Sequence, residues 1–119
     1  MNVDIKTLLQ LTATLSFIGM SYQVNAQNTA SNISEQRQQQ LLHLVKQDCG
    51  SCHGMTLKGG LGPALTKQAL KDKPLLLLKN TIIHGRPGTA MPPWNKIINE
   101  QEALWISEQL MQGIKDEKK

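Results

Sequence analysis

The chain has 119 residues, a formal net charge of +4 and an aromatic content of only 3%. This length provides one small domain and excludes a second. The basic residues form no continuous run and are not interleaved with aromatic side chains. The composition therefore gives no support for nucleic-acid binding.

Residues 1–26 have the pattern of a secretory signal peptide. Lys6 lies in a short leading segment, the thirteen residues 8–20 carry no charge, and Val24-Asn25-Ala26 suits a signal peptidase. A buried helix and an uncleaved anchor are the alternatives, but thirteen residues cover about 20 Å, less than a bilayer core of about 30 Å. We predict cleavage after Ala26, a periplasmic location and no membrane anchor in the mature protein.

The mature chain is expected to begin with a polar, frayed lead-in over residues 27–33. A single domain is expected over residues 34–112, followed by a charged tail over 113–119. Trp94 and Trp105 are the only aromatic residues that remain after cleavage. A core with so little aromatic volume predicts that a bound group fills its centre.

The domain has helical patterns and no convincing strand, which predicts an all-α fold. Ser34 is an expected N-cap, and the spacing of Leu41, Leu44 and Val45 predicts a first helix over 34–48. A loop with four glycines follows over 54–62, and a short helix is expected over 65–71.

The second half of the domain alternates helices with a proline-rich loop. Pro74 suits the first position of a helix over 74–84, with an apolar face that includes Leu76, and Gly85 stands just past its end. Residues 86–94 contain three prolines, so regular structure is excluded there. Asn99 and Glu102 have the spacing of a capping box that opens a last helix, expected to run to about residue 111.

The pattern Cys49-Gly50-Ser51-Cys52-His53 carries the chemistry. A disulfide would close too small a loop, a thioredoxin-like dithiol needs a βαβ context, and zinc needs a second pair of ligands. Cys-x-x-Cys-His is the attachment signature of haem c. Two thiols three residues apart on a helical turn meet the two vinyl groups, and the next residue brings an imidazole to the iron. We predict one covalent haem c with His53 as proximal ligand.

Other side chains are expected around that haem. The carbonyl of Pro63 can accept a hydrogen bond from the second ring nitrogen of His53, although this proline could also only stiffen its turn. Arg86 and Trp94 can donate hydrogen bonds to the propionates. A solvent-facing arginine and a core tryptophan are the alternatives.

Met91 is the predicted distal ligand. It lies 38 residues after His53 in a loop stiffened by prolines, which lowers the entropic cost of holding its thioether on the iron. His84 is the alternative ligand, whereas three other candidates are too close to His53, in the core or on the wrong helix: Met55, Met111 and His43. Histidine and methionine ligation fills both axial positions, which is typical of an electron carrier and not of an enzyme. A haem sensor or peroxidase would need a labile distal site, and a dithiol oxidoreductase would need free cysteines.

Lysines outnumber acidic residues in the region expected around the haem. They could steer an acidic redox partner, or they could be an ordinary solvated surface. These lysines are Lys58, Lys67, Lys71, Lys73, Lys79 and Lys96.

Three stretches of the domain carry a family resemblance. They read Cys-Gly-Ser-Cys-His-Gly-Met-Thr-Leu-Lys-Gly-Gly-Leu-Gly-Pro-Ala-Leu, Thr-Ile-Ile-His-Gly-Arg-Pro-Gly-Thr-Ala-Met-Pro-Pro-Trp and Glu-Ala-Leu-Trp-Ile. Together they resemble NirC-type proteins, which are small periplasmic monohaem cytochromes c encoded beside cytochrome cd-type nitrite reductase. The resemblance covers about residues 41–111.

The resemblance implies a small class I cytochrome c fold, with helices packed around one covalent haem, and a monomer. It places the haem on Cys49 and Cys52, with His53 and Met91 as axial ligands. His84 stays an alternative, because related reductase domains can use a histidine on the distal side. Two roles follow from the family, and both remain open: electron donor to nitrite reductase, or redox partner of a protein that matures its haem d1.

Overall fold

The structure is a computed structural model that describes residues 32–114. The predicted signal peptide, most of the lead-in and most of the charged tail lie outside these residues. The helices are α1 (Glu35–Leu44), the π-helical turn η3 (Val45–Cys49), α2 (Gly50–His53), α3 (Lys67–Leu70), α4 (Leu75–His84) and α5 (Glu100–Gln112). The described part of the chain contains no strand, so the all-α prediction is confirmed.

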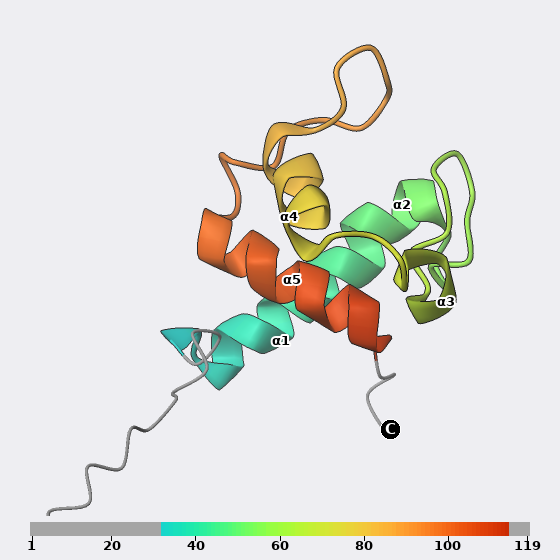
Figure 1. Ribbon diagram of the computed structural model, residues 1–119. Helices are drawn as coiled ribbons and strands as arrows, with labels where there is room; N and C mark the ends of the chain where they lie inside the picture. The colour runs from blue at the N-terminus through green and yellow to red at the C-terminus, as the bar shows by residue number, and fades with distance from the viewer. Residues whose placement is uncertain (1–31, 115–119) are drawn as a thin grey trace, which may run out of the picture.

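Helix α5 is the centre of the arrangement. It crosses α1 near one end, packs along α4 and also contacts α3 (Figure 1). Leu41 of α1 and Ile106 of α5 are almost completely buried. Ser107 is buried too, and its hydroxyl donates to the carbonyl of Ala103 at 2.8 Å, which satisfies its polar atom inside the core.

The first helix extends further than predicted and changes pitch on the way. Ser34 is the N-cap, and its hydroxyl accepts a hydrogen bond from the N–H of Arg37 at 3.3 Å. The prediction of one helix ending at residue 48 is wrong. In η3 the N–H of Gly50 reaches the carbonyl of Val45, five residues back, and helical structure then continues to His53.

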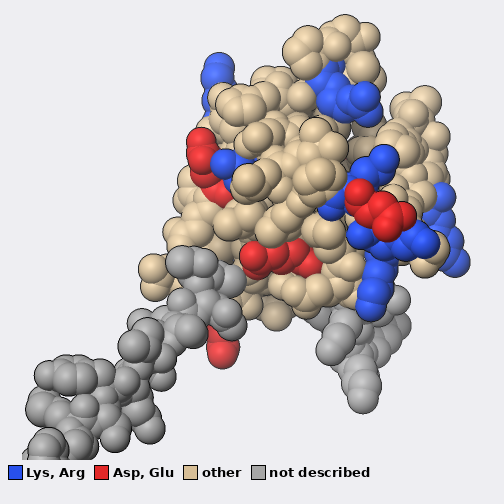
Figure 2. Space-filling model, in the orientation of Figure 1, with Lys and Arg blue, Asp and Glu red and all other residues tan. Residues whose placement is uncertain are grey.

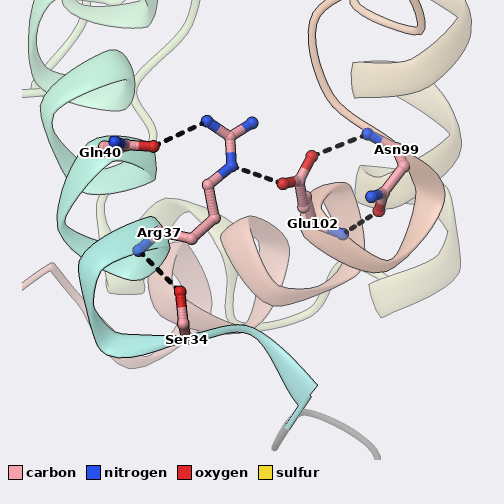
Figure 3. Close-up of polar contacts among 5 residues, drawn as sticks. All are labelled: Ser34, Arg37, Gln40, Asn99 and Glu102. Carbon is pink, nitrogen blue, oxygen red and sulfur yellow. Dashed lines mark hydrogen bonds and ion pairs between the residues drawn. The ribbon is translucent and has the colours of Figure 1, made fainter.

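A polar network holds α1 against the start of α5 (Figure 3). The predicted capping box is present: the side chain of Asn99 accepts from the N–H of Glu102, and the Glu102 carboxylate accepts from the N–H of Asn99, both at 2.9 Å. The same carboxylate accepts from Nε of Arg37 at 2.6 Å. The hydrogen bond from Arg37, helped by the Asn99 N–H, lowers the pKa of Glu102.

Four other expectations need correction. Ile33 was expected in the frayed lead-in, but it is buried and its carbonyl accepts from the Gln38 side chain at 2.9 Å. The second helix is shorter than predicted because Thr66 caps it, accepting from the N–H of Ala69 at 3.3 Å. Pro74 is the N-cap of α4 and not its first helical residue. Leu76, assigned to the apolar face of that helix, is 62% exposed.

Candidate haem-binding site

The helices and two loops enclose a cavity of about 430 Å³. This volume lies within the range of about 300–1,000 Å³ that is common for cofactor and ligand sites. The cavity brings together four predicted site residues: Cys49, Cys52, His53 and Met91. Its walls are mostly apolar and include Leu44, Leu70, Leu78, Ile82, Ile106 and Leu110.

The helical turn through the motif directs both cysteines to this cavity. Cys49 and Cys52 are not joined in a disulfide, and each is half-buried. Burial, followed by the nearby charge of Asp48, raises the pKa of Cys49 to about 11. A dithiol oxidoreductase needs a thiolate near neutral pH, so this environment argues against that alternative.

His53 is held by the loop that follows it. Its Nδ1 donates to the carbonyl of Pro63 at 2.7 Å, the contact expected from the sequence. The N–H of Gly59 bonds to the carbonyl of His53 at 2.8 Å, and that of Gly62 to the carbonyl of Cys52 at 2.9 Å. A Cβ at Gly62 would lie 2.6 Å from Cε1 of the imidazole, so only glycine leaves room for the ring.

Met91 is brought to the cavity by a loop closed largely on itself. The N–H of Arg86 bonds to the carbonyl of Met91 at 3.1 Å. The hydroxyl of Thr89 donates to the carbonyl of Arg86 at 2.7 Å and accepts from the N–H of Met91 at 3.3 Å. Gly85 has φ +67°, and a Cβ there would lie 2.6 Å from the backbone of Pro92. Sequence reasoning treated Gly85 only as a helix end and did not single out Thr89, although threonine is a typical turn residue.

The remaining predicted site residues divide between the cavity and the surface. Arg86 and Trp94 both line the cavity, and the N–H of Trp94 donates to the carbonyl of Ile82 at 3.1 Å. His84 is exposed and is not among the lining residues.

Four polar residues at the cavity wall were not predicted as ligands or haem partners: Asp48, Lys73, Thr81 and Thr89. Lys73 was expected only among the lysines around the haem. The hydroxyl of Thr81 is already used, since it donates to the carbonyl of Leu77 at 2.7 Å. The helical spacing of Thr81 with Leu78 and Ile82 was the available signal for its position.

Comparison with known proteins agrees with this geometry. Residues 36–108 match the family described as cytochrome c oxidase, cbb3-type, subunit III. The chain is 54% identical over 78 residues to cytochrome c55X of Stutzerimonas stutzeri, covering 66% of this chain and 69% of that protein. It is 48% identical over 75 residues to cytochrome c55X of Paracoccus denitrificans, covering 63% and 73%. The chain therefore belongs to the cytochrome c family whose model it matches over residues 36–108.

Solved structures extend the likeness to three dimensions. The c-type cytochrome NirC matches this cytochrome with a TM-score of 0.65 and 51% identity, covering 66% of this chain and 93% of that chain. Dihydro-heme d1 dehydrogenase NirN matches with a TM-score of 0.57 and 29% identity, but only 17% of that chain is covered. The predicted NirC-type resemblance and the cytochrome c fold are therefore confirmed.

The residues at the cavity fit the cofactor that this family carries. A cytochrome c domain binds haem c covalently, and Cys49 and Cys52 stand in the positions of the Cys-x-x-Cys-His motif. The apolar walls suit a large planar ring, and the space kept beside His53 by Gly62 suits an axial imidazole. This cytochrome is thus a monohaem electron-transfer protein. Within residues 32–114, no helix is both long and apolar enough to span a bilayer.

Proposed function

We propose that this cytochrome carries single electrons in the periplasm to cytochrome cd-type nitrite reductase. The observation that carries the proposal is one mostly apolar cavity lined by His53 from the end of α2 and by Met91 from the proline-rich loop, beside the cysteine pair. With both side chains on the iron, no coordination position would remain open for a substrate. This arrangement favours a carrier over a sensor, a peroxidase or another enzyme.

Each site residue has a role in this proposal. Cys49 and Cys52 would hold the haem through two thioether bonds, and His53 and Met91 would ligate its iron. Because Nδ1 of His53 donates to Pro63, its Nε2 is the nitrogen left with a lone pair for the iron. When bound, the haem supplies one-electron oxidation and reduction at that iron.

The cavity walls and its rim contribute in different ways. The apolar side chains keep water away from the site, which controls its dielectric and so its reduction potential. Arg86 and Trp94 belong to the proline-rich loop over residues 86–94. They are the proposed partners of the haem propionates, since both line the cavity.

The choice of nitrite reductase rests on the NirC likeness over most of the domain. One observation favours a second candidate, service in haem d1 maturation. A 48-residue stretch is 40% identical to dihydro-heme d1 dehydrogenase of Pseudomonas aeruginosa, covering 10% of that enzyme. The two candidates use the same site residues, so a functional experiment must separate them. Export after cleavage at Ala26, a domain over residues 34–112 and a monomeric state belong to the same proposal.

Deletion of the gene in the host separates the two roles. Loss of an electron donor should leave nitrite reductase that contains haem d1 but receives electrons slowly. Loss of a maturation partner should leave reductase with missing or immature haem d1, visible in its absorption spectrum. Purified reduced cytochrome should also reduce the enzyme directly, at a rate that falls as salt rises. Slow transfer without salt dependence would favour the maturation role.

A further inference from the structure

The structure divides the six predicted lysines into two groups. Four of them, Lys58, Lys67, Lys71 and Lys73, belong to the glycine-rich loop and to α3 with the turn that follows it. Lys79 and Lys96 belong to α4 and to the segment that leads into α5. Figure 1 shows α3 and the start of α5 at opposite sides of the molecule. A single ring of lysines around the haem is therefore not what the fold provides.

The lysines near α3 form a basic surface. The N–H of Leu65 bonds to the carbonyl of Leu57 at 2.9 Å, which brings the turn containing Lys58 next to the start of α3. Lys71 lies 4.0 Å from the carboxylate of Asp72, and both side chains are exposed, so this pairing is weak. Figure 2 shows basic side chains gathered on this side, over α3 and the glycine-rich loop.

The other group carries less free charge. Nζ of Lys79 lies 2.9 Å from the Glu100 carboxylate, and the lysine side chain is only 17% exposed. Its charge is neutralised locally, which leaves Lys96 as the exposed lysine of that side. Of the six lysines, most of the exposed and weakly paired ones therefore gather beside α3.

Leu61 gives the basic surface an apolar contact. It is 90% exposed, yet it also lines the cavity. The backbone on either side fixes the position of Leu61. The N–H of Gly62 donates to the carbonyl of Cys52, and Gly60 packs so closely that a Cβ there would lie 2.7 Å from the same carbonyl oxygen. A leucine this exposed adds little to folding, but it can bury its side chain against another protein beside the haem-bearing cysteine.

We propose that Leu61, Lys58, Lys67 and Lys71 form a docking surface for the acidic face of an electron-transfer protein. The lysines steer the approach, and Leu61 makes the short-range contact next to Cys52. One electron leaves the reduced cytochrome and one enters the partner, with no bond made or broken. The identity of that partner as nitrite reductase rests on the proposed function, whereas the location of the surface does not.

Charge reversal at single lysines tests the surface on the intact, haem-loaded protein. Lys58→Glu and Lys71→Glu should each lower the second-order rate of electron transfer to nitrite reductase about three- to tenfold at low ionic strength, with a smaller loss at high salt. The matched control is Lys96→Glu, which makes the same charge change on the other side and should alter the rate less than about twofold. Equal effects at all three positions would overturn the proposal.

The apolar contact has its own matched pair. Leu61→Ser should slow the transfer at every ionic strength, because it removes a contact and no charge. Leu76→Ser changes a leucine that is 62% exposed on α4 and is not among the cavity-lining residues, so it should leave the rate unchanged. Loss of rate with Leu76→Ser and not with Leu61→Ser would place the contact elsewhere and reject this surface.

A small anionic oxidant separates failure of the surface from failure of the proposed function. Ferricyanide should be reduced more slowly by Lys58→Glu and Lys71→Glu than by Lys96→Glu, whatever the biological partner is. If ferricyanide gives that ranking but the wild type transfers no electrons to nitrite reductase, the reductase is not the partner and the proposed docking surface stands. If all variants transfer electrons to the reductase at one common rate, the proposed function stands and the docking surface is rejected. A third outcome is that the lysine variants bind vesicles of anionic phospholipid more weakly but reduce the reductase at unchanged rates. That result would assign these lysines to membrane binding and would also reject the proposed docking surface.

Discussion

The glycine-rich loop on the His53 side of the cavity is bonded to the cysteine motif itself, whereas the proline-rich loop on the Met91 side is bonded mainly to its own residues. Backbone bonds from Gly59 and Gly62 reach the carbonyls of His53 and Cys52. The Met91 loop closes through Arg86 and Thr89 instead. The geometry around His53 is therefore a local consequence of the motif, while the geometry around Met91 depends on how the proline-rich loop leaves α4 and enters α5.

The largest effect is expected from variants that cannot attach the haem. Replacing Cys49 and Cys52 together by alanine should leave little folded protein, because the apolar cavity walls would then face water. Circular dichroism and urea unfolding measure this. Ser51→Ala is the control between the two cysteines, since it removes only exposed hydrogen bonds, from its hydroxyl to the Asp48 carbonyl at 2.6 Å and to Sγ of Cys52 at 3.9 Å. A cooperative, well-folded double variant would show that the two loops do not need the cofactor to hold their positions.

The next effect concerns the distal side alone. Met91→Ala should abolish the methionine-to-iron charge-transfer band of the oxidised protein and lower the reduction potential, because the thioether ligand raises that potential. His84→Ala should leave both unchanged, since His84 is exposed and is not a cavity-lining residue. Loss of the band in His84→Ala and not in Met91→Ala would make His84 the ligand, and the proline-rich loop would then have no part in binding the iron.

Two glycines allow the loops to be disturbed one at a time. Gly62→Ala would place a Cβ 2.6 Å from the His53 ring, and we expect a loss of about 2–3 kcal/mol in the free energy of unfolding. Gly85→Ala would press on the Pro92 backbone and should weaken the methionine-to-iron band while the proximal side stays intact.

The control for both variants is Gly88→Ala. This position has φ +76° but no atom within 4 Å of the new Cβ, so only the backbone cost of about 1 kcal/mol is expected. A weakened methionine band in Gly62→Ala alone would show that the two loops are coupled.

The smallest expected effect tests how α5 is held at the end of the distal segment. Glu102→Gln keeps an acceptor for the Asn99 N–H but loses the ion pair with Arg37, and should cost about 1–2 kcal/mol at pH 7. Because Arg37 holds the folded-state pKa of Glu102 below its ordinary value of 4.5, the ionised carboxylate stabilises the fold at neutral pH. This stabilisation is lost as the pH falls below about 4.5 and through the folded-state pKa.

Urea unfolding at a series of pH values measures this effect. The difference between wild type and Glu102→Gln should shrink as the pH falls. Glu100→Gln is the control at the ion pair with Lys79, where the effect should be smaller than at Glu102 because the Glu100 carboxylate is exposed. A difference between wild type and Glu102→Gln that grows in acid would contradict the assigned ion pair.

Sequence reasoning was most successful where an interaction joins residues close together in the chain. The Ser34 cap, the Asn99 capping box and the contact between His53 and Pro63 each span ten residues or fewer, and all are present. Residue types and short spacings determine such contacts, because the intervening backbone has few ways to bring the groups together.

Interactions between distant residues could not be read in the same way. Arg37 and Glu102 are 65 positions apart, and nothing in either local pattern pairs them. The pairing of Lys79 escaped prediction for the same reason, since its partner Glu100 lies 21 positions later in the chain. The exposure of Leu61 also escaped prediction, because composition alone assigns leucine to a core.

The wide turn η3 has a consequence for the length of the chain ahead of the haem motif. A residue in an α-helix advances by about 100° around the axis, so one extra residue in a regular helix would turn the thiols away from the cavity. Leu41 of α1 and Val45 of η3 are fixed in the core, and the motif follows only four residues after Val45. The five-residue step from Val45 to Gly50 absorbs one extra residue within a single turn, so the core side chains before it and the thiols after it keep their directions. Deleting Gln47 should therefore convert η3 into an ordinary α-helical turn and leave Cys49 and Cys52 facing the cavity.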